Sequence, residues 1–209
     1  MCNKSVCLII FIFVMTFAVH NSFGELVAYY PMDEGSGTLI RDFSGNIHHG
    51  QAQADPVWQD GQTNYGKAIY FDGSEPQPAW IDCGTWNPSD QTGELTVACW
   101  IKWGGLNDNW QGIIGKRDGW DPEPDGPMMW YFEINGANGY LLFGRRDHYD
   151  VGIMDVTVQD EWQHLAATFD RVTGSIYVNG ELVTSDDFSL GPKEDAAIVI
   201  GADILLADR

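Results

Sequence analysis

The segment from Glu161 to Val183 is the feature of this sequence that most constrains its fold. Leu165 and His164 begin two alternating rows, one apolar and one more polar, with the two-residue period of a half-buried β-strand. The chain then reverses across Asp170–Gly174. Asn179-Gly180 predicts a second tight turn, because both residues tolerate positive φ angles. Two reversals in so short a segment predict an antiparallel sheet.

Short strand-like runs and turn signals alternate along the rest of the sequence, and helical patterns are nearly absent. The predicted strands are Val27–Tyr30, Ala68–Asp72, Ala79–Cys83, Leu95–Lys102, Gly112–Lys116, Met128–Ile134, Tyr140–Arg145, Val151–Val156, Trp162–Asp170, Gly174–Val178 and Ala197–Ile200. Their connectors are rich in Asp-Gly and Asn-Gly pairs, which favour tight turns. The pattern predicts an all-β fold, a two-sheet antiparallel jelly-roll sandwich in which each sheet buries one face.

The first 24 residues have the pattern of a secretory signal peptide. Lys4 precedes an apolar run from Leu8 to Val19, and small residues precede Glu25. The run is shorter than the roughly 20 residues of a membrane span, and no second apolar run follows it. We therefore expect residues 1–24 to be a removed signal and residues 25–209 to be one exported domain, secreted or at the cell surface, without membrane insertion.

The chain is strongly acidic, with 30 Asp and Glu residues against 11 Lys and Arg and a formal net charge of -19. Such a surface is a poor partner for nucleic acid or an anionic membrane. Solvated surface carboxylates explain the excess most simply, and calcium binding is the sharper interpretation.

The segment Asp118–Gly126 is the best candidate for a calcium site. Asp121, Glu123 and Asp125 occupy alternate positions before a glycine, as in the first half of a calcium loop, where oxygens from alternate residues converge on one cation. Two prolines and the missing flanking helices exclude an EF-hand, and a plain acidic loop is the alternative. Asp42 or Asp72, each before a tight turn, is a second possibility, although capping the turn is the simpler role.

Cys83 and Cys99 are the two cysteines that lie beyond the signal segment. In an exported protein they can form a disulfide. Each also lies at an inward position of a predicted strand, where an unlinked thiol behaves as a small core residue. The sequence leaves both alternatives open.

Several further segments occur in a characteristic order along the chain. They are Ala28–Gly37, Asp42–Asn46, Gly66–Gly73, Leu95–Lys102, the opening hairpin and Ile198–Gly201. Together they resemble the laminin G-like jelly-roll domain of the concanavalin A-like lectin/glucanase superfamily. The resemblance covers nearly all of residues 25–209 and implies the same sandwich that the strand pattern predicts.

One departure from that family concerns the C-terminus. Members usually follow the Ile-Gly strand with a further strand that closes the sheet beside the first one, whereas this chain stops at Arg209. We expect a C-terminally truncated sequence that lacks its final closing strand. The alternative is an unpaired edge at Val27–Tyr30, which would be an aggregation liability.

The resemblance also raises the question of catalysis, because the superfamily includes glycoside hydrolases. Retaining hydrolases of this fold carry Glu-x-Asp-x-x-Glu on one strand, which sets the carboxylates about 5 to 5.5 Å apart. That motif is missing here, since Asp155 and Asp160-Glu161 have a different spacing and Glu133 stands alone. We therefore expect no catalytic residues.

Aromatic side chains form the candidate binding site, because sugars stack their apolar faces on such rings. The candidate ligand-binding residues are Trp100, Lys102, Tyr131 and His164 on outward strand positions, and Trp110 and Trp120 in loops. The competing interpretation is that loops cover these rings, which then form a second small core.

The sequence thus predicts an exported, non-catalytic module that binds carbohydrate or extracellular matrix, with calcium as a candidate cofactor and further domains in the full-length protein. One alternative is a structural or adhesion spacer of a larger surface protein. A divergent glycoside hydrolase is the other.

Overall fold

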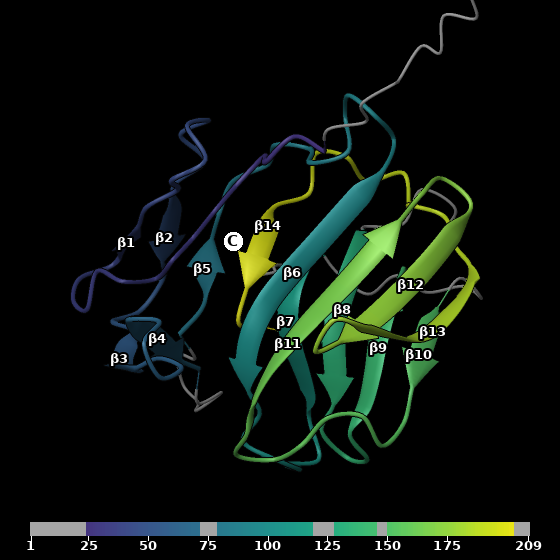
Figure 1. The fold of residues 1–209 in the computed structure, drawn as a ribbon. Coiled ribbons are helices and arrows are strands. Elements are labelled where there is room, and N and C mark those ends of the chain that lie inside the picture. Colours follow the sequence, from purple (N-terminus) through teal and green to yellow (C-terminus); the bar gives the residue numbers. More distant parts are fainter. Residues whose placement is uncertain (1–23, 72–78, 119–127, 146–149, 203–209) are drawn as a thin grey trace, which may run out of the picture.

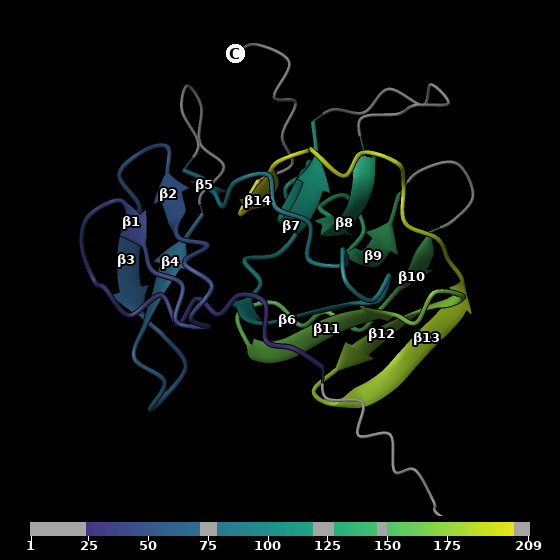
Figure 2. The same cartoon turned by 90° about the horizontal axis from the view of Figure 1, so that it is seen from above.

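The computed structural model describes residues 24–71, 79–118, 128–145 and 150–202, and these ranges form strands and connecting segments (Figures 1 and 2). The strands are β1 (Leu39–Ile40), β2 (Gly50–Ala52), β3 (Val57–Asp60), β4 (Lys67–Tyr70), β5 (Ile81–Asp82), β6 (Leu95–Lys102), β7 (Trp110–Arg117), β8 (Met128–Asn135), β9 (Tyr140–Gly144), β10 (Val151–Ile153), β11 (Trp162–Phe169), β12 (Thr173–Val178), β13 (Glu181–Asp187) and β14 (Ile198–Ile200). The predicted all-β sandwich is confirmed. Nothing in the described ranges is a helix of the length and apolarity needed to cross a bilayer.

Two antiparallel sheets form the layers of the sandwich. One has eight strands in the order β1-β2-β5-β14-β7-β8-β9-β10, and the other has four in the order β13-β12-β11-β6. Seen from above, the two lie face to face, with β1 to β5 gathered at one side (Figure 2). A separate pair, β3-β4, belongs to that side. Among the described strands, β6 therefore ends its sheet and pairs with β11 alone.

The opening hairpin is β11 and β12, and it has the predicted alternation. Leu165 pairs with Val178, and Leu165 and Ile176 are fully buried. Asn179 and Gly180 have φ angles of 51° and 85°, so the second turn has the predicted left-handed backbone. The inward residues of the hairpin thus form one wall of the core.

The main core lies between the two sheets. From the four-stranded sheet it takes Leu95, Leu165 and Phe169, and from the eight-stranded sheet it takes Trp130 and Phe132. Burying each large side chain stabilises the fold by about 1.5 to 3 kcal/mol relative to exposure. The two rows that the sequence assigns to the core therefore hold the layers together.

A second cluster lies beneath the strands at the N-terminal side and joins them to β14. Ile40, Ile81 and Ile198 form its centre. Next to it, the buried Nζ of Lys116 donates to the carbonyl oxygens of Thr85 and Ala196, and burial lowers the pKa of this lysine to about 8. This lysine ties β7 to two connecting segments, so its role is structural.

The predicted strand Val27–Tyr30 is wrong, because these residues are not in a strand. The backbone N–H of Tyr29 donates to the Asp42 carboxylate, and the N–H of Phe43 donates to the Tyr29 carbonyl. A side chain thus takes a hydrogen bond that a neighbouring strand would otherwise supply. Strands β1, β2, β3 and β13 were missed, three of them because they are only two to four residues long.

Candidate functional site

The register between β6 and β11 places a row of candidate residues on the outer face of the four-stranded sheet. Trp100 pairs with His164, and Lys102 pairs with Trp162. The rings of Trp100 and His164 make an edge contact with centroids 5.4 Å apart. Trp100 nevertheless remains 42% exposed, so solvent reaches a large indole surface.

The loop between β3 and β4 adds a third ring. Tyr65 is 64% exposed, and its ring centroid lies 6.1 Å from that of Trp100. The loop is held in place because Lys67 forms an ion pair with Asp60 across the hairpin and its backbone N–H donates to Asp33. We call Trp100, Tyr65 and His164 the aromatic platform.

A large groove runs along the unpaired edge of β6 and includes the platform. The lining includes the aromatic platform, Lys102 and Trp110, and it continues to the buried side chains of Trp130 and Ile134. We call it the β6 groove. Its volume of about 2370 Å³ thus includes space against the core as well as the surface beside the platform.

The β6 groove therefore unites four of the predicted ligand-binding residues, namely Trp100, Lys102, His164 and Trp110. Trp110, the first residue of β7, is 41% exposed. Tyr65 was missed, since nothing in the sequence of a short loop shows which strand it will fold against. For Trp100 the alternative of a ring covered by loops is wrong.

The placement of Tyr131 beside Trp100 is wrong. Tyr131 lies on β8, which pairs with β7 and β9 in the eight-stranded sheet, and it is only 3% exposed. There it packs with Met128 and Leu142 in a small cluster. The inward and outward alternation of β8 is as predicted, with Trp130 and Phe132 in the main core. Tyr131 is therefore outward, but on the sheet that does not contain Trp100.

The remaining predicted site residues differ in what the structure says of them. Trp120 and the calcium candidates Asp72, Asp121, Glu123 and Asp125 lie outside the described residues. Among the residues that are described, no group of three or more His, Cys, Asp or Glu side chains is arranged to hold a metal ion.

Asp42 has the turn-capping role that the sequence favours. Its carboxylate accepts hydrogen bonds from the backbone N–H groups of Tyr29, Ser44 and His48 and from the Ser44 hydroxyl. Burial raises the pKa of Asp42, but the hydrogen bonds from Ser44, Tyr29 and His48 outweigh it and lower the pKa to about 2.

The disulfide between Cys83 and Cys99 is not formed, and both residues are free thiols. Cys83 belongs to the cluster beneath the N-terminal strands, whereas Cys99 packs against the main core. Burial raises the pKa of each thiol to about 12. The two thiols are thus core residues in separate clusters, which is the other alternative that the sequence left open.

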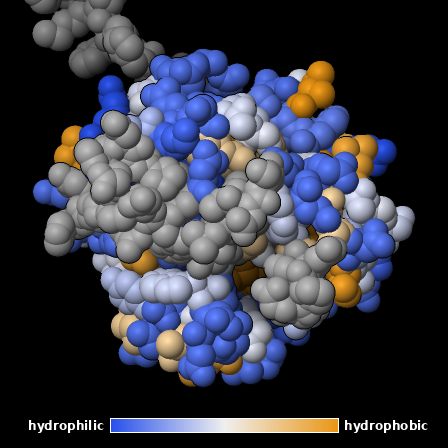
Figure 3. Space-filling model, turned by 180° about the vertical axis from the view of Figure 1, so that it is seen from behind, coloured by the Kyte–Doolittle hydropathy of each residue, from blue (hydrophilic) through white to orange (hydrophobic). Residues whose placement is uncertain are grey.

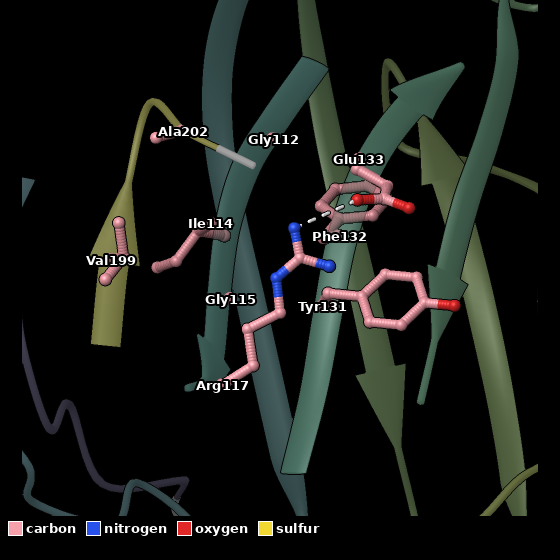
Figure 4. Close-up of a pocket in the computed structure, with 9 residues that line it drawn as sticks. All are labelled: Gly112, Ile114, Gly115, Arg117, Tyr131, Phe132, Glu133, Val199 and Ala202. Atoms are coloured by element: carbon pink, nitrogen blue, oxygen red, sulfur yellow. Dashed lines mark ion pairs between the residues drawn. The ribbon is translucent and has the colours of Figure 1, made fainter. Parts of the chain in front are cut away.

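The outer face of the eight-stranded sheet carries a different constellation, around a small pocket (Figure 4). Arg117 of β7 approaches Glu133 of β8, with Nη2 and Oε2 3.4 Å apart. The Arg117 guanidinium also lies over the Tyr131 ring, 5.2 Å from its centroid. Tyr131 in turn donates from its hydroxyl to Asp150 at 3.2 Å.

These charged side chains are almost completely removed from water. Arg117 is 4% exposed and Glu133 is 1% exposed. Burial raises the pKa of Glu133 to about 7, while Arg117 opposes this shift and Asp150 adds to it. The sequence singled out Glu133 only as an unpaired acid, and Arg117 lies just beyond a predicted strand, so this pair was missed.

Residues 79–208 match the Laminin_G_3 family, described as the concanavalin A-like lectin/glucanases superfamily. Among curated proteins no match is found.

Two solved structures are similar to this chain to different degrees, and the first of them has the same type of fold. Domain 4 of AbnA, a GH43 extracellular arabinanase from Geobacillus stearothermophilus solved with arabinotriose, is 18% identical, with a TM-score of 0.61 over 84% of this chain and 82% of that one. The carbohydrate-binding module CBM66 from Bacillus subtilis is 13% identical, with a TM-score of 0.43 over 73% of this chain and 87% of that one.

Proposed function

This chain belongs to the concanavalin A-like lectin/glucanase superfamily, and we propose that it is a carbohydrate-binding module whose ligand lies in the β6 groove. The observation that carries the proposal is the exposed aromatic platform. Trp100 and Tyr65 are 42% and 64% exposed with ring centroids 6.1 Å apart, so the two rings form one exposed aromatic surface.

The platform has the chemistry that a sugar ring needs. The C–H faces of a sugar stack on indole and phenol rings, and neighbouring polar groups take its hydroxyls. Lys102 is exposed and lies two residues after Trp100 on the same face of β6, and its ammonium group can donate hydrogen bonds to sugar hydroxyls. Both the rings and Lys102 line the β6 groove, so one ligand can contact them together.

The absence of catalysis is part of the same proposal. Two carboxylates of the β6 groove already have structural partners, since Glu94 pairs with Arg171 at 3.0 Å and Asp33 accepts the N–H of Lys67. Export belongs to the proposal as well, supported by the signal-like pattern of residues 1–24.

The experiment is a glycan array followed by calorimetry, with arabinotriose as the first probe because the similar arabinanase domain was solved with it. The wild-type protein should bind at least one glycan, and Trp100→Ala should weaken that binding about tenfold. Phe43→Ala is the matched control, since Phe43 is 62% exposed but does not line the groove.

Other results would favour the other functions. A protein that binds no glycan on the array would contradict the proposal and support a structural or adhesion spacer. Release of shortened glycans would support a hydrolase. The proposed calcium site is tested by repeating the calorimetry with calcium, with chelator, and with the Asp121→Ala/Asp125→Ala variant. Equal heats in all three experiments would contradict the calcium site.

A further inference from the structure

The carboxylate of Glu133 has an exceptional environment for a buried charge. Glu133 is 1% exposed, and neither of its oxygens has a hydrogen-bond partner within the described ranges. The 3.4 Å approach of Arg117 offsets part of its charge. Buried polar groups in proteins are nearly always hydrogen-bonded, because leaving one without a partner costs about 1 to 3 kcal/mol. The Glu133 carboxylate can therefore accept a hydrogen bond from a donor that reaches it.

The pocket beside Glu133 limits what that partner can be. Its cavity has a volume of about 10 Å³, which is close to the minimum for one water-sized group. Gly112, Gly115 and Ala202 contribute to its lining, and their small or absent side chains leave this space open. Figure 4 shows Glu133, Arg117 and Tyr131 side by side around it.

The charge pattern narrows the chemistry further. A carboxylate accepts hydrogen bonds, so the missing group must be a donor. A cation is disfavoured because the Arg117 guanidinium lies at the same place. A whole sugar ring is far larger than the cavity, whereas a hydroxyl group fits it. A neutral O–H donor meets all three conditions, and it can belong to a water molecule or to a hydroxyl group of a ligand.

We propose that this pocket is a second carbohydrate contact, in which one sugar hydroxyl enters the cavity and donates to Glu133. The inference rests on the proposed function. The pocket lies on the outer face of the eight-stranded sheet, and Gly112, Ile114 and Ala202 line both it and the β6 groove, so the two sites adjoin. The described surface on that side is mainly hydrophilic, as expected for a polar contact (Figure 3).

Ligand binding through this pocket should depend on pH. Only ionised Glu133 accepts the hydroxyl with both oxygens, and burial brings its pKa to about 7. The charged and titratable groups that face it are Arg117 of β7, Tyr131 of β8 and Asp150 before β10. Affinity should therefore rise between pH 6 and pH 8.

The test measures the affinity of the best glycan from the array at pH 6 and pH 8. We compare the wild type, Glu133→Gln and Ala202→Leu, the last of which fills the cavity without changing a charge. Losing a hydrogen bond to a charged group should weaken binding about tenfold at pH 8. The rise with pH should disappear in Glu133→Gln. Trp100→Ala should keep the rise, because its platform is on the other sheet.

The outcomes separate this inference from the proposed function. If the wild type binds a glycan, but both pocket variants keep its affinity and its pH profile, the inference is wrong and the carbohydrate-binding proposal stands. If the wild type binds no glycan at all, both fall. If Glu133→Gln does not fold, Ala202→Leu decides the question by the same comparison.

Discussion

The outer faces of the two sheets treat their outward side chains in opposite ways. On the four-stranded sheet, Trp100 keeps 42% of its surface in water beside the equally outward His164. On the eight-stranded sheet, Tyr131 and Glu133 are 3% and 1% exposed. One face thus leaves an apolar ring exposed to solvent, and the other buries a charged carboxylate away from solvent.

Both arrangements cost free energy. Exposed rings forgo the gain from burial, about 1.5 to 3 kcal/mol for a large side chain, and a buried charge pays a desolvation penalty of several kcal/mol. The two proposed contacts would offset these costs, since a ligand would cover the rings on one face and complete the hydrogen bonds of the carboxylate on the other.

The largest effect should come from removing one member of the buried pair. Arg117→Met leaves Glu133 without its counter-charge, and breaking a buried pair in this way costs about 3 to 5 kcal/mol. Urea unfolding at pH 8 measures the loss. At pH 5 the loss should be smaller, because Glu133 is then protonated.

The control for this variant is Lys193→Met. Lys193 pairs with Asp195 at 2.9 Å, but Asp195 is largely exposed, and such surface pairs contribute about 0 to 1 kcal/mol. Two results would contradict the prediction. One is a loss for Arg117→Met as small as that for Lys193→Met, and the other is a loss for Arg117→Met that is the same at pH 5 and pH 8. Either would show that removing Arg117 does not leave an uncompensated charge on Glu133.

The second effect is the pH dependence of stability that Glu133 causes. Its folded pKa, about 7, lies above the ordinary 4.5, so the native state holds a proton that the unfolded state has lost. Stability from this group is fully present below about pH 4.5 and is lost as pH rises to 7, by about 3 kcal/mol in all.

The measurement is the difference in unfolding free energy between wild type and Glu133→Gln across pH 4 to 8. Subtracting the variant removes other groups such as Asp42, whose lowered pKa acts in the opposite direction between about pH 4 and pH 2. A difference that does not change with pH would mean that Glu133 titrates normally.

The part of the fold that sequence predicted best is the alternation within each strand. The run Leu95–Lys102 is β6 with the predicted bounds, and Leu165 and Phe169 are buried as expected. Alternation depends only on neighbouring residues, because successive side chains point to opposite faces. It is readable wherever a strand is long enough to repeat.

Alternation does not say which sheet a strand joins. Tyr131 has the correct parity, yet it lies across the sandwich from Trp100 because β7, β8 and β9 pair with one another and not with β6. The Arg117–Glu133 contact depends further on two register shifts between β7 and β8, at Gly112/Ile114 and Lys116/Arg117. Such irregularities leave no repeat in the sequence.

A smaller effect is expected from the loop ring of the exposed face. Tyr65→Ala removes one edge of the aromatic platform and should weaken glycan binding about threefold to tenfold, with little change in stability because Tyr65 is 64% exposed. Titration calorimetry measures the affinity and thermal unfolding measures the stability, with Trp100→Ala measured in parallel. If Tyr65→Ala binds like the wild type while Trp100→Ala does not, the platform ends at β6 and the loop takes no part.

The smallest effect should come from reducing agent. Cys83 and Cys99 are free and lie in separate clusters, one beneath the N-terminal strands and one on the inner face of β6. A disulfide between them would tie the two sides of the sandwich together, and losing such a bond typically costs about 2 to 5 kcal/mol. We expect no shift in melting temperature with reductant, and alkylation of both thiols after unfolding without it. A clear loss of stability on reduction would contradict this expectation. It would mean that Cys83 and Cys99 are linked, and that the two clusters lie closer together than in the structure.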